Sequence, residues 1–437
     1  MSVYIDLKQK IKKKKAIITV MGLGYVGLPI ALEFCKKGFS VNGLDTNLRR
    51  IRKLRKGMSY INDISDSEIS GILKTKRFKV TADPKVLNVS DAVIMCVPTP
   101  LRKIKEPDIS YVVRASKVLS RYLRHGQIVV LESTTYPGTT RDIMLPELRK
   151  SGLEMDKDFY LAFSPERIDP GNPKYSFVNI PKVIGGFNKR GTELGRLLYS
   201  SVIRKVVGVS NPEVAEVTKL LENTFRIVNI GLINEFAHLC HKLKIDVWEV
   251  IKAAKTKPFG FMPFYPGPGI GGHCIPADPV YLSWKARKVG FETRMVDLAA
   301  KVNRGVPAHI VERVGDMLKE KKIKFAGAKI LLMGVTYKKD VNDLRESPAL
   351  DIIEALKKKK VKLSYHDPFI PYLDVHGIKA RSRKITPALL KKQDLVIVVT
   401  DHSDIDYSVI AKNAKVVFDT RDIFEKKKIK SENIVKL

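Results

Sequence analysis

The residues with the clearest capacity for chemistry end a glycine- and proline-rich stretch, Gly267–Pro279, which reads GPGIGGHCIPADP. Glycine permits positive φ and close backbone approach, and proline fixes φ, so the stretch predicts a defined irregular loop. It carries Cys274 and, four residues later, Asp278. Backbone N–H groups in such a loop can stabilise a thiolate, which makes Cys274 a candidate nucleophile. An inert, buried cysteine is the alternative, because free cysteines are among the most buried residues.

A second candidate site is a dinucleotide-binding motif within residues 16–45. A short β-branched run, residues 16–21, leads into the sequence GLGYVG, then into a helical pattern that Gly38 stops, and then into a second apolar run that ends at Asp45. Strand, G-x-G-x-x-G, helix, strand and acid at this spacing are typical of a dinucleotide-binding βαβ unit.

Each glycine of GLGYVG has an expected task. Gly22 makes the tight turn, Gly24 lets the backbone approach a pyrophosphate at the helix N-terminus, and Gly27 lets the helix lie close to the strand. Asp45 is expected to hydrogen-bond the adenosine ribose, and its charge repels a 2′-phosphate. The motif therefore predicts NAD rather than NADP as cofactor.

Polar residues follow three further apolar runs, residues 91–97, 127–131 and 159–163. They open into Pro98-Thr99, into Glu132-Ser133-Thr134 and into the sequence SPERIDPG, respectively. Ligands of doubly wound sheets bind beyond the carboxyl ends of the strands, so these segments are expected to line the same site. Cys96 is expected to be a core thiol.

A long helical pattern begins after Asn211-Pro212 and runs towards Lys255. Lys219 and Asn223 are four residues apart and therefore project from one helix face. A charge and an amide donor together suit an oxyanion. The alternative is a polar stripe exposed to solvent. Taken without the rest of the chain, Lys219 and Asn223 favour this alternative. A helix of this length between two α/β units commonly connects domains and forms a dimer surface.

From Ala328 the strand–helix pattern of the first half returns, and a last strand is expected over residues 415–419. The second and third motif glycines are missing here. The segment Val335-Thr336-Tyr337-Lys338-Lys339 replaces them, which makes the turn basic, and Arg345 follows. This predicts a second α/β domain suited to a different phosphorylated ligand. A solvated lysine loop is the alternative, chiefly for Lys339.

Composition narrows the class of protein. The 437 residues favour two or three domains. The four cysteines form no CxxC pair, which argues against a zinc site and a disulfide framework and fits a reducing cytosol. No metal, signal peptide or membrane span is expected. The formal net charge is +33, but its basic runs are spread along the chain without interleaved aromatics, so nucleic acid is not the expected partner. A cationic surface that attracts an anionic substrate is expected instead.

Together these motifs resemble the UDP-glucose/GDP-mannose dehydrogenase family from residue 16 to about residue 425. The segments that carry the resemblance are Gly22–Gly27 with Asp45, Val97–Pro100, Glu132–Thr134, Ser164–Arg167, Lys219 to Asn223, Gly271–Cys274 with Asp278, and Lys338 to Arg345 with Glu346–Pro348. The resemblance implies an α/β fold of two Rossmann-like, doubly wound parallel-sheet domains joined by a long central helix. The expected parts are a basic lead (1–15), an NAD-binding domain (16–210), a central helical dimerisation region with the cysteine loop (211–310) and a UDP-sugar-binding domain (311–437).

The resemblance also implies a reaction, the four-electron oxidation of a nucleotide sugar at C6 with two NAD used in turn. Cys274 would add to the aldehyde to form a thiohemiacetal, a second oxidation would give a thioester, and water would release the uronic acid. Asp278 is implied as an acid/base or water-orienting partner, and Lys219 and Asn223 as oxyanion stabilisers. Asp278, the field of Lys219 and the loop N–H groups all remain possible activators of Cys274.

Thr134 is implied to hold the hydrolytic water and Glu166 to act as the base. A strand-end salt bridge with Arg167 is the alternative role of Glu166. Some family members carry a second Glu four residues further on, where this chain has Pro170 beside Asp169, so the base assignment stays open.

The implied ligand contacts extend over both domains. The cofactor contacts are Gly22, Gly24, Tyr25, Val26, Gly27, Asp45, Arg50, Pro98, Thr99, Thr134 and Arg345. The substrate contacts are Glu166, Arg167, Lys219, Asn223, Lys257, Gly271 and Lys338. The sequence PERIDPGN around Glu166 and residues 257–263 look most like the UDP-N-acetylglucosamine 6-dehydrogenase branch, with UDP-N-acetylmannosamine and UDP-glucose as alternatives.

The expected protein is a cytoplasmic homodimer or higher homo-oligomer whose product feeds surface polysaccharide or glycan synthesis. A competing hypothesis is a protein that binds NAD or a nucleotide sugar without catalysis. The joint presence of six expected catalytic residues argues against it; they are Cys274, Asp278, Lys219, Asn223, Thr134 and Glu166.

Overall fold

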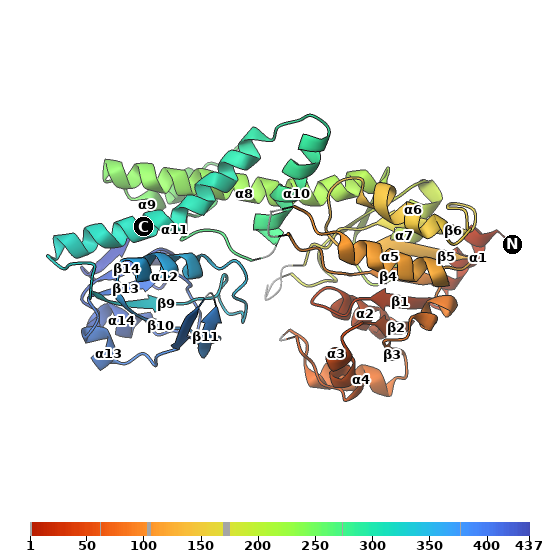
Figure 1. Cartoon of the computed structure of the whole chain (residues 1–437), viewed down its shortest axis with the longest axis horizontal. Helices are drawn as coiled ribbons and strands as arrows, with labels where there is room; N and C mark the ends of the chain where they lie inside the picture. The colour runs from red at the N-terminus through yellow and green to blue at the C-terminus, as the bar shows by residue number, and fades with distance from the viewer. Residues whose placement is uncertain (1, 62, 103–105, 169–174, 273, 376) are drawn as a thin grey trace. The chain divides into compact units, whose positions relative to one another are not determined.

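The computed structural model (Figure 1) describes residues 2–61, 63–102, 106–168, 175–272, 274–375 and 377–437. The chain divides into two compact units. The first is Met1–Glu222 with Val280–Phe291, and the second is Asn223–Pro279 with Glu292–Leu437. The domain boundaries expected from the sequence stay predictions. Within the described residues, none of the helices combines the length and the apolar character that a membrane crossing requires.

The first unit is built on a sheet that has eight strands within the described residues, in the order β3-β2-β1-β4-β5-β6-β7-β8. The strands are β1 (Ile17–Met21), β2 (Ser40–Leu44), β3 (Phe78–Thr81), β4 (Ala92–Met95), β5 (Gln127–Leu131), β6 (Phe159–Phe163), β7 (Lys182–Gly186) and β8 (Val206–Val209). Neighbouring strands are parallel except β6 and β7. The order reverses between β1 and β4, and such a switch point creates the ligand crevice of doubly wound sheets.

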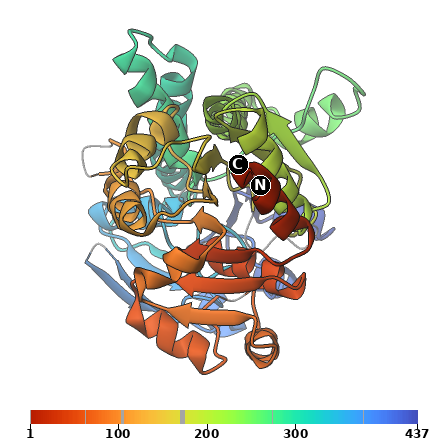
Figure 2. The same cartoon turned by 90° about the vertical axis from the view of Figure 1, so that its right-hand side faces the viewer.

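Helices cover both faces of this sheet, and Figure 2 turns the molecule to show its strands from the side. They are α1 (Val3–Lys12), α2 (Gly27–Lys36), α3 (Leu48–Arg55), α4 (Asp66–Lys74), η1 (Pro84–Val89), α5 (Ser110–Tyr122), η2 (Thr140–Met144), α6 (Leu145–Arg149) and α7 (Lys189–Ser200). Side chains cap several of them: Asn47 accepts from Arg49 N and Arg50 N, and Ser65 accepts from Glu68 N.

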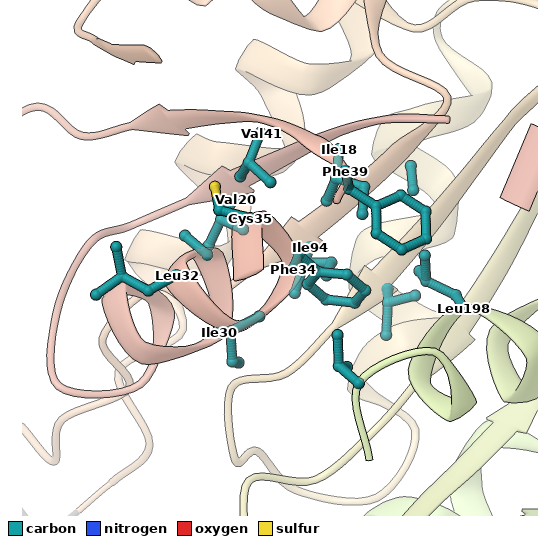
Figure 3. Close-up of a cluster of buried hydrophobic side chains, with 14 of the residues drawn as sticks. Ile18, Val20, Ile30, Leu32, Phe34, Cys35, Phe39, Val41, Ile94 and Leu198 are labelled. Atoms are coloured by element: carbon teal, nitrogen blue, oxygen red, sulfur yellow. The ribbon is translucent and has the colours of Figure 1, made fainter. Parts of the chain in front are cut away.

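The core of the first unit lies in two layers, one on each side of the sheet. In β4, Ala92 and Ile94 join one cluster, and Val93 and Met95 join the other. Strands buried on both faces read as continuous apolar runs, which explains why this sequence lacks polar alternation. Figure 3 shows the first cluster, in which Phe34 of α2 lies close to Ile94. This packing fixes α2 against the strands whose ends carry the nucleotide motif.

Four helices lie between the two sheets in sequence. They are α8 (Pro212–Leu243), α9 (Val247–Ala254), α10 (Cys274–Lys288) and α11 (Arg294–Glu320). Asn211 accepts a hydrogen bond from Val214 N at 2.9 Å and so begins α8. The helix α10 starts at Cys274 itself and contains Pro279.

The second unit contains a parallel sheet with the order β10-β9-β13-β14-β15. Its strands are β9 (Lys329–Met333), β10 (Lys362–His366), β13 (Leu395–Val398), β14 (Val417–Asp419) and β15 (Ile434–Lys436), beside the hairpin of β11 (Tyr372–Val375) and β12 (Ile378–Arg381). The helices are α12 (Pro348–Lys358), α13 (Pro387–Lys391), α14 (Tyr407–Asn413) and α15 (Ile423–Lys426). The predicted α/β class with two Rossmann-like parallel-sheet domains and a long central helix is confirmed. The expectation that the chain closes with the strand at residues 415–419 is wrong, because β15 follows it.

Candidate active site

The turn after β1 has the geometry of a phosphate-binding loop. Gly22 has φ +92°, and a Cβ there would overlap the carbonyl oxygen of Cys96. A Cβ on Gly27 would overlap the carbonyl oxygen of Gly22. Around Gly24, in contrast, an added Cβ would meet no heavy atom of the described residues within 4 Å. Packing therefore explains two of the glycines. The open side of Gly24 leaves room for a pyrophosphate, so this turn fits a dinucleotide.

Asp45 sits directly after β2 and is buried. Its Oδ2 accepts from Leu23 N at 2.8 Å, and its Oδ1 accepts from Asn47 N at 2.7 Å. Arg50 Nη1 lies 3.4 Å from Oδ2. Each carboxylate oxygen can accept more than one hydrogen bond, so Asp45 holds the turn and still has capacity for ribose hydroxyls.

The loops after β4 and β5 are joined to each other. Ser133 Oγ donates to Val97 O at 2.6 Å. Thr99, two residues after Val97, is buried. Thr134 is half-buried. These positions follow the carboxyl ends of β4 and β5, where the sequence predicts ligand contacts.

Glu166 follows β6 and is held by its neighbours. Its Oε1 accepts from Arg167 N at 2.6 Å and from Ile168 N at 2.5 Å. The Arg167 guanidinium pairs instead with Glu222 of α8 at 2.6 Å. The alternative of a salt bridge between Glu166 and the Arg167 side chain is therefore wrong. Asp169 and Pro170 lie outside the described residues.

The helix α8 carries both expected oxyanion stabilisers. Lys219 and Asn223 are buried, so the alternative of a solvated polar stripe is wrong. One turn before Lys219, the buried Glu216 accepts from Gly138 N at 2.6 Å and from Thr140 N at 2.9 Å. Glu216 thereby fixes α8 to the loop after β5.

Within the second unit, Asn223 Nδ2 donates to Oδ2 of Asp278, and both side chains are buried. Asp278 lies in the first turns of α10, four residues after Cys274. The expectation that Gly267–Pro279 is loop throughout is wrong for its last residues, because helix α10 already begins at Cys274. Cys274 is the first residue of α10 and Asp278 the fifth.

The glycines before Cys274 are required by close packing in the second unit. A Cβ on Gly271 would lie 2.6 Å from both the Glu346 carbonyl oxygen and Tyr337 Cβ. Gly272 has φ +84°, donates to Arg345 O at 2.9 Å, and would place a Cβ 2.8 Å from the Tyr337 ring. The expected substrate contact at Gly271 therefore has a packing role as well.

Beyond its first turns, α10 packs on the loops of the first unit. Tyr281 OH donates to the carbonyl oxygen of Thr99, and the Trp284 ring lies 4.8 Å from that of Tyr136. The part of α10 that belongs to the first unit thus contacts the loops after β4 and β5.

The expected ligand residues of the second unit are more scattered. Arg345 binds Asp343 at 2.6 Å and lines a cavity of about 410 Å³. Lys257 is exposed, 5.1 Å from the centre of the Phe259 ring. Lys338 lies in the turn after β9. The described contacts thus bring together Asn223 and Asp278, and the turn of Gly22 with Asp45.

The sequence did not point to Lys182, Glu216 or Tyr281. Lys182 contacts Glu132, Glu216 contacts the loop after β5, and Tyr281 contacts Thr99. In each case the two partners are far apart in the chain. A lone charge at the start of a strand and a lone tyrosine on a helix give no local signal. Only the tertiary structure identifies them.

Known proteins match this chain over nearly its whole length. Models of the UDP-glucose/GDP-mannose dehydrogenase family match residues 16–203 (NAD binding domain), 213–305 (central domain) and 331–426 (UDP binding domain). The UDP-N-acetyl-D-glucosamine 6-dehydrogenase of Pseudomonas aeruginosa is 38% identical over 355 residues, which cover 81% of this chain and 83% of that protein. The UDP-N-acetyl-D-mannosamine dehydrogenase of Pyrococcus horikoshii is 33% identical, with 93% and 96% covered. The chain belongs to the UDP-glucose/GDP-mannose dehydrogenase family.

A solved structure of UDP-D-ManNAc dehydrogenase from P. horikoshii agrees with a TM-score of 0.86 at 32% identity and covers 96% of this chain and 98% of that one. As a member of the UDP-glucose/GDP-mannose dehydrogenase family, the protein is an NAD-dependent oxidoreductase that acts on a UDP-sugar. The predicted family, enzyme class and cofactor are confirmed. The roles of individual site residues stay predictions.

Proposed function

We propose that the enzyme oxidises the C6 hydroxyl of a UDP-N-acetylhexosamine to the uronic acid through a covalent intermediate on Cys274. The observation that carries the proposal is the start of α10, where Cys274 occupies the first helical position and Asp278 follows one turn later. The N-terminus of a helix favours a thiolate through its free N–H groups and its dipole. This geometry favours backbone N–H groups, aided by Asp278, as the means of activation.

Bound NAD supplies the acceptor for each of the two hydrides that leave C6. The residues of the chain do the remaining work. The Cys274 thiolate adds to the C6 aldehyde, and the thiohemiacetal that it forms is oxidised to a thioester. Lys219 and Asn223, both buried, stabilise the oxyanions. The Asn223–Asp278 hydrogen bond orients the amide for that task.

Hydrolysis completes the reaction. Thr134 holds a water molecule, and Glu166 takes a proton from it as the oxygen attacks the thioester carbon and the Cys274 thiolate leaves. The amide N–H groups of Arg167 and Ile168 fix Oε1 of Glu166. The second oxygen is then the one placed to accept the proton.

We favour UDP-N-acetylglucosamine as the substrate, with UDP-N-acetylmannosamine and UDP-glucose as alternatives. The P. aeruginosa relative, named for N-acetylglucosamine, is 38% identical, and the P. horikoshii relative, named for N-acetylmannosamine, is 33% identical. These values are close, so the choice needs a direct assay.

We further propose a homodimer formed through α8. Large apolar side chains recur on this helix at spacings of three, four and seven residues and are exposed in the single chain. They are Val214, Val217, Leu221, Phe225, Leu232, Phe236, Leu239 and Leu243. A row of this length on a 32-residue helix is an apolar surface that a second copy can cover.

The test is to incubate the enzyme with NAD and a panel of UDP-N-acetylglucosamine, UDP-N-acetylmannosamine, UDP-N-acetylgalactosamine and UDP-glucose while following NADH. Fast turnover of an N-acetylhexosamine supports the proposal, and turnover of UDP-glucose alone contradicts the substrate class. The Cys274→Ser variant should stall before the acid forms. Cys240→Ser is the matched control, because Cys240 is a buried cysteine in the last turns of α8 and has no role in the proposed reaction. If Cys274→Ser made acid at the normal rate, the thioester route would be wrong.

A further inference from the structure

A buried cluster of charged side chains lies beside Glu166. Lys182 Nζ is 2.6 Å from Oε2 of Glu132, 3.3 Å from the carbonyl oxygen of Pro165 and 3.8 Å from Oε2 of Glu166. Tyr199 OH donates to the other oxygen of Glu132. The side chains of Lys182 and Glu132 are 4% and 0% exposed, respectively.

The sheet explains why Lys182 faces Glu166. The antiparallel pair of β6 and β7 joins Ala162 to Gly186 and Phe163 to Gly185. Continued past the end of β6, the same register sets Glu166 opposite Lys182, the first residue of β7. Ser164 Oγ donates to Val183 O at 2.7 Å and so extends the pairing.

The ammonium group is enclosed on its remaining sides. It lies 5.1 Å from the centre of the Tyr199 ring and 5.8 Å from that of Phe177. Aromatic faces attract a cation and exclude water, so the charge of Lys182 acts on its two carboxylates with little screening. Oε2 of Glu166 is buried and accepts no hydrogen bond from the described residues. Lys182 is therefore the charged neighbour that bears on this oxygen.

Burial and charge shift the pKa values of Glu132, Lys182 and their neighbours in this cluster. Burial raises the pKa of Glu132 to about 7, against the opposing charge of Lys182, and the charge of Glu166 raises it further. Burial alone lowers the pKa of Lys182, but Glu132 and Glu166 outweigh it and raise that pKa, so the amine stays charged. Burial also raises the pKa of the nearby Cys96 thiol and of Tyr199 well above their usual ranges, so both remain neutral.

We propose that Lys182 is a positioning residue whose buried ammonium group faces Oε2 of Glu166 and supports Glu166 as the base of the hydrolytic step, while Glu132 holds the ammonium group in place from the other side. As the pH falls through about 7, Glu132 takes up a proton, and the charge of Lys182, 3.8 Å from Oε2 of Glu166, then acts on Glu166 without a competing carboxylate. This inference rests on the proposed function, in which Glu166 is the base that accepts a proton from water.

A purely structural ion pair is the competing explanation. Breaking a buried pair from either side leaves one partner without its charge. A structural role therefore predicts similar losses for Lys182→Met and Glu132→Gln. The proposal predicts different pH profiles, because only Lys182→Met removes the cation that faces Glu166.

The experiment measures the pH dependence of kcat for the full-length enzyme with saturating NAD and UDP-sugar, together with the fraction of enzyme that carries the sugar thioester after an acid quench, by intact mass spectrometry. In Lys182→Met the acid limb of the kcat profile should move up by about one pH unit or more, the usual effect of losing an opposite charge at this distance. The thioester should accumulate at pH 7. In Glu132→Gln the limb should stay in place or move to lower pH, and Lys182→Arg should restore the profile of the wild type.

The double variant Lys182→Met/Glu132→Gln guards against misfolding, because it leaves neither member of the pair as an unpaired buried charge. It should fold, bind NAD as the wild type does, and still show the raised acid limb. If the double variant and Lys182→Met keep the wild-type profile while Glu166→Gln blocks hydrolysis, the role of Lys182 is refuted. If Glu166→Gln hydrolyses the thioester normally, or the wild type makes no NADH, the proposed function itself fails.

Discussion

The two Rossmann-like units share the same turn after their first strand but differ in the side chains that surround it. Gly22 N donates to Leu44 O at 2.7 Å in the first unit, and Gly334 N donates to His366 O at 2.8 Å in the second. Both glycines have positive φ, +92° and +81°. A carboxylate follows the second strand of each pair, Asp45 in one and Asp367 in the other.

The difference lies in what meets that carboxylate. In the first unit, Arg50 contacts it near the surface, and the turn is open beside Gly24. In the second unit, His402 Nε2 lies 3.0 Å from Oδ2 of Asp367, and both side chains are fully buried. A Cβ on Gly334 would overlap the side chain of Thr400. The counterpart of Asp45 in the second unit is thus paired with a buried histidine, whereas Asp45 itself keeps capacity for a ribose.

The largest effect is expected from Asp367→Ala. This change removes the acceptor of the Val335 amide, at 2.7 Å, and of buried His402. Loss of a buried, charge-assisted network costs about 3 to 5 kcal/mol of unfolding free energy. Urea unfolding measures it, and NAD affinity should not change. In the matched variant Asp45→Ala, the loss of NAD binding free energy should exceed the loss of unfolding free energy. If the Asp367→Ala enzyme unfolds like the wild type, the hydrogen bonds of Asp367 to Val335 and His402 do not stabilise the unit.

Gly24→Val should weaken NAD binding at least 100-fold, about 2.7 kcal/mol, by filling the open side of the turn. The melting temperature should change by only a few degrees, because a Cβ added at Gly24 would meet no heavy atom of the described residues within 4 Å. Titration calorimetry with NAD measures the loss. Gly71→Val in α4, another glycine with open space around it, is the matched control and should bind NAD normally. Equal losses in both variants would refute the assignment of the pyrophosphate to this turn.

Two buried carboxylates should respond to pH with opposite signs. Burial raises the pKa of Glu216 to about 7, although hydrogen bonds from Thr140 and Gly138 oppose it. Its contribution to stability is therefore full below its ordinary pKa and is lost as pH rises through 7. Burial also acts on Asp367, but hydrogen bonds from His402 and nearby amides outweigh it and lower its pKa, so its contribution is lost only on acidification.

The Glu216→Gln variant tests this sign. Relative to the wild type, it should gain about 2 kcal/mol of stability between pH 5 and pH 8, which denaturant melts at both values measure. A difference between the two proteins that does not change with pH would show that Glu216 is ionised throughout this range.

The smallest effect is expected from Thr336→Gly, which restores a glycine at the second motif position of the second unit. The change removes a hydrogen bond to Lys338 O at 2.9 Å and should cost about 1 kcal/mol. It should create no second NAD site, because His402 still pairs with Asp367, the counterpart of Asp45. Calorimetry should give the same number of NAD per chain as in the wild type, and a higher number would break the comparison.

The sequence predicted what local patterns encode. The GLGYVG turn with Asp45 and the apolar strands could be recognised because their spacing is short and periodic. Helix α1 was read only as a basic lead, although Leu7 and Ile11 are buried on one face of it. The glycines and prolines of Gly267–Pro279 predict loop throughout, yet α10 begins at Cys274: Pro276 lies in its first turn, where proline is tolerated, and Pro279 lies inside the helix.

Contacts between distant residues could not be predicted. Lys182 and Glu132 are fifty positions apart, and nothing in either neighbourhood predicts a buried ion pair. The sequence likewise does not predict that His402 pairs with Asp367, because the two residues belong to different strand–helix segments. Such partners are set by register and topology rather than by local spacing.

The central claim is tested most directly by the number of NADH formed per UDP-N-acetylhexosamine consumed, with the sugar limiting and NAD in excess. The proposed route predicts two NADH per sugar and a uronic acid as the product. One NADH per sugar with an aldehyde as the product, or no NADH at all, would contradict it.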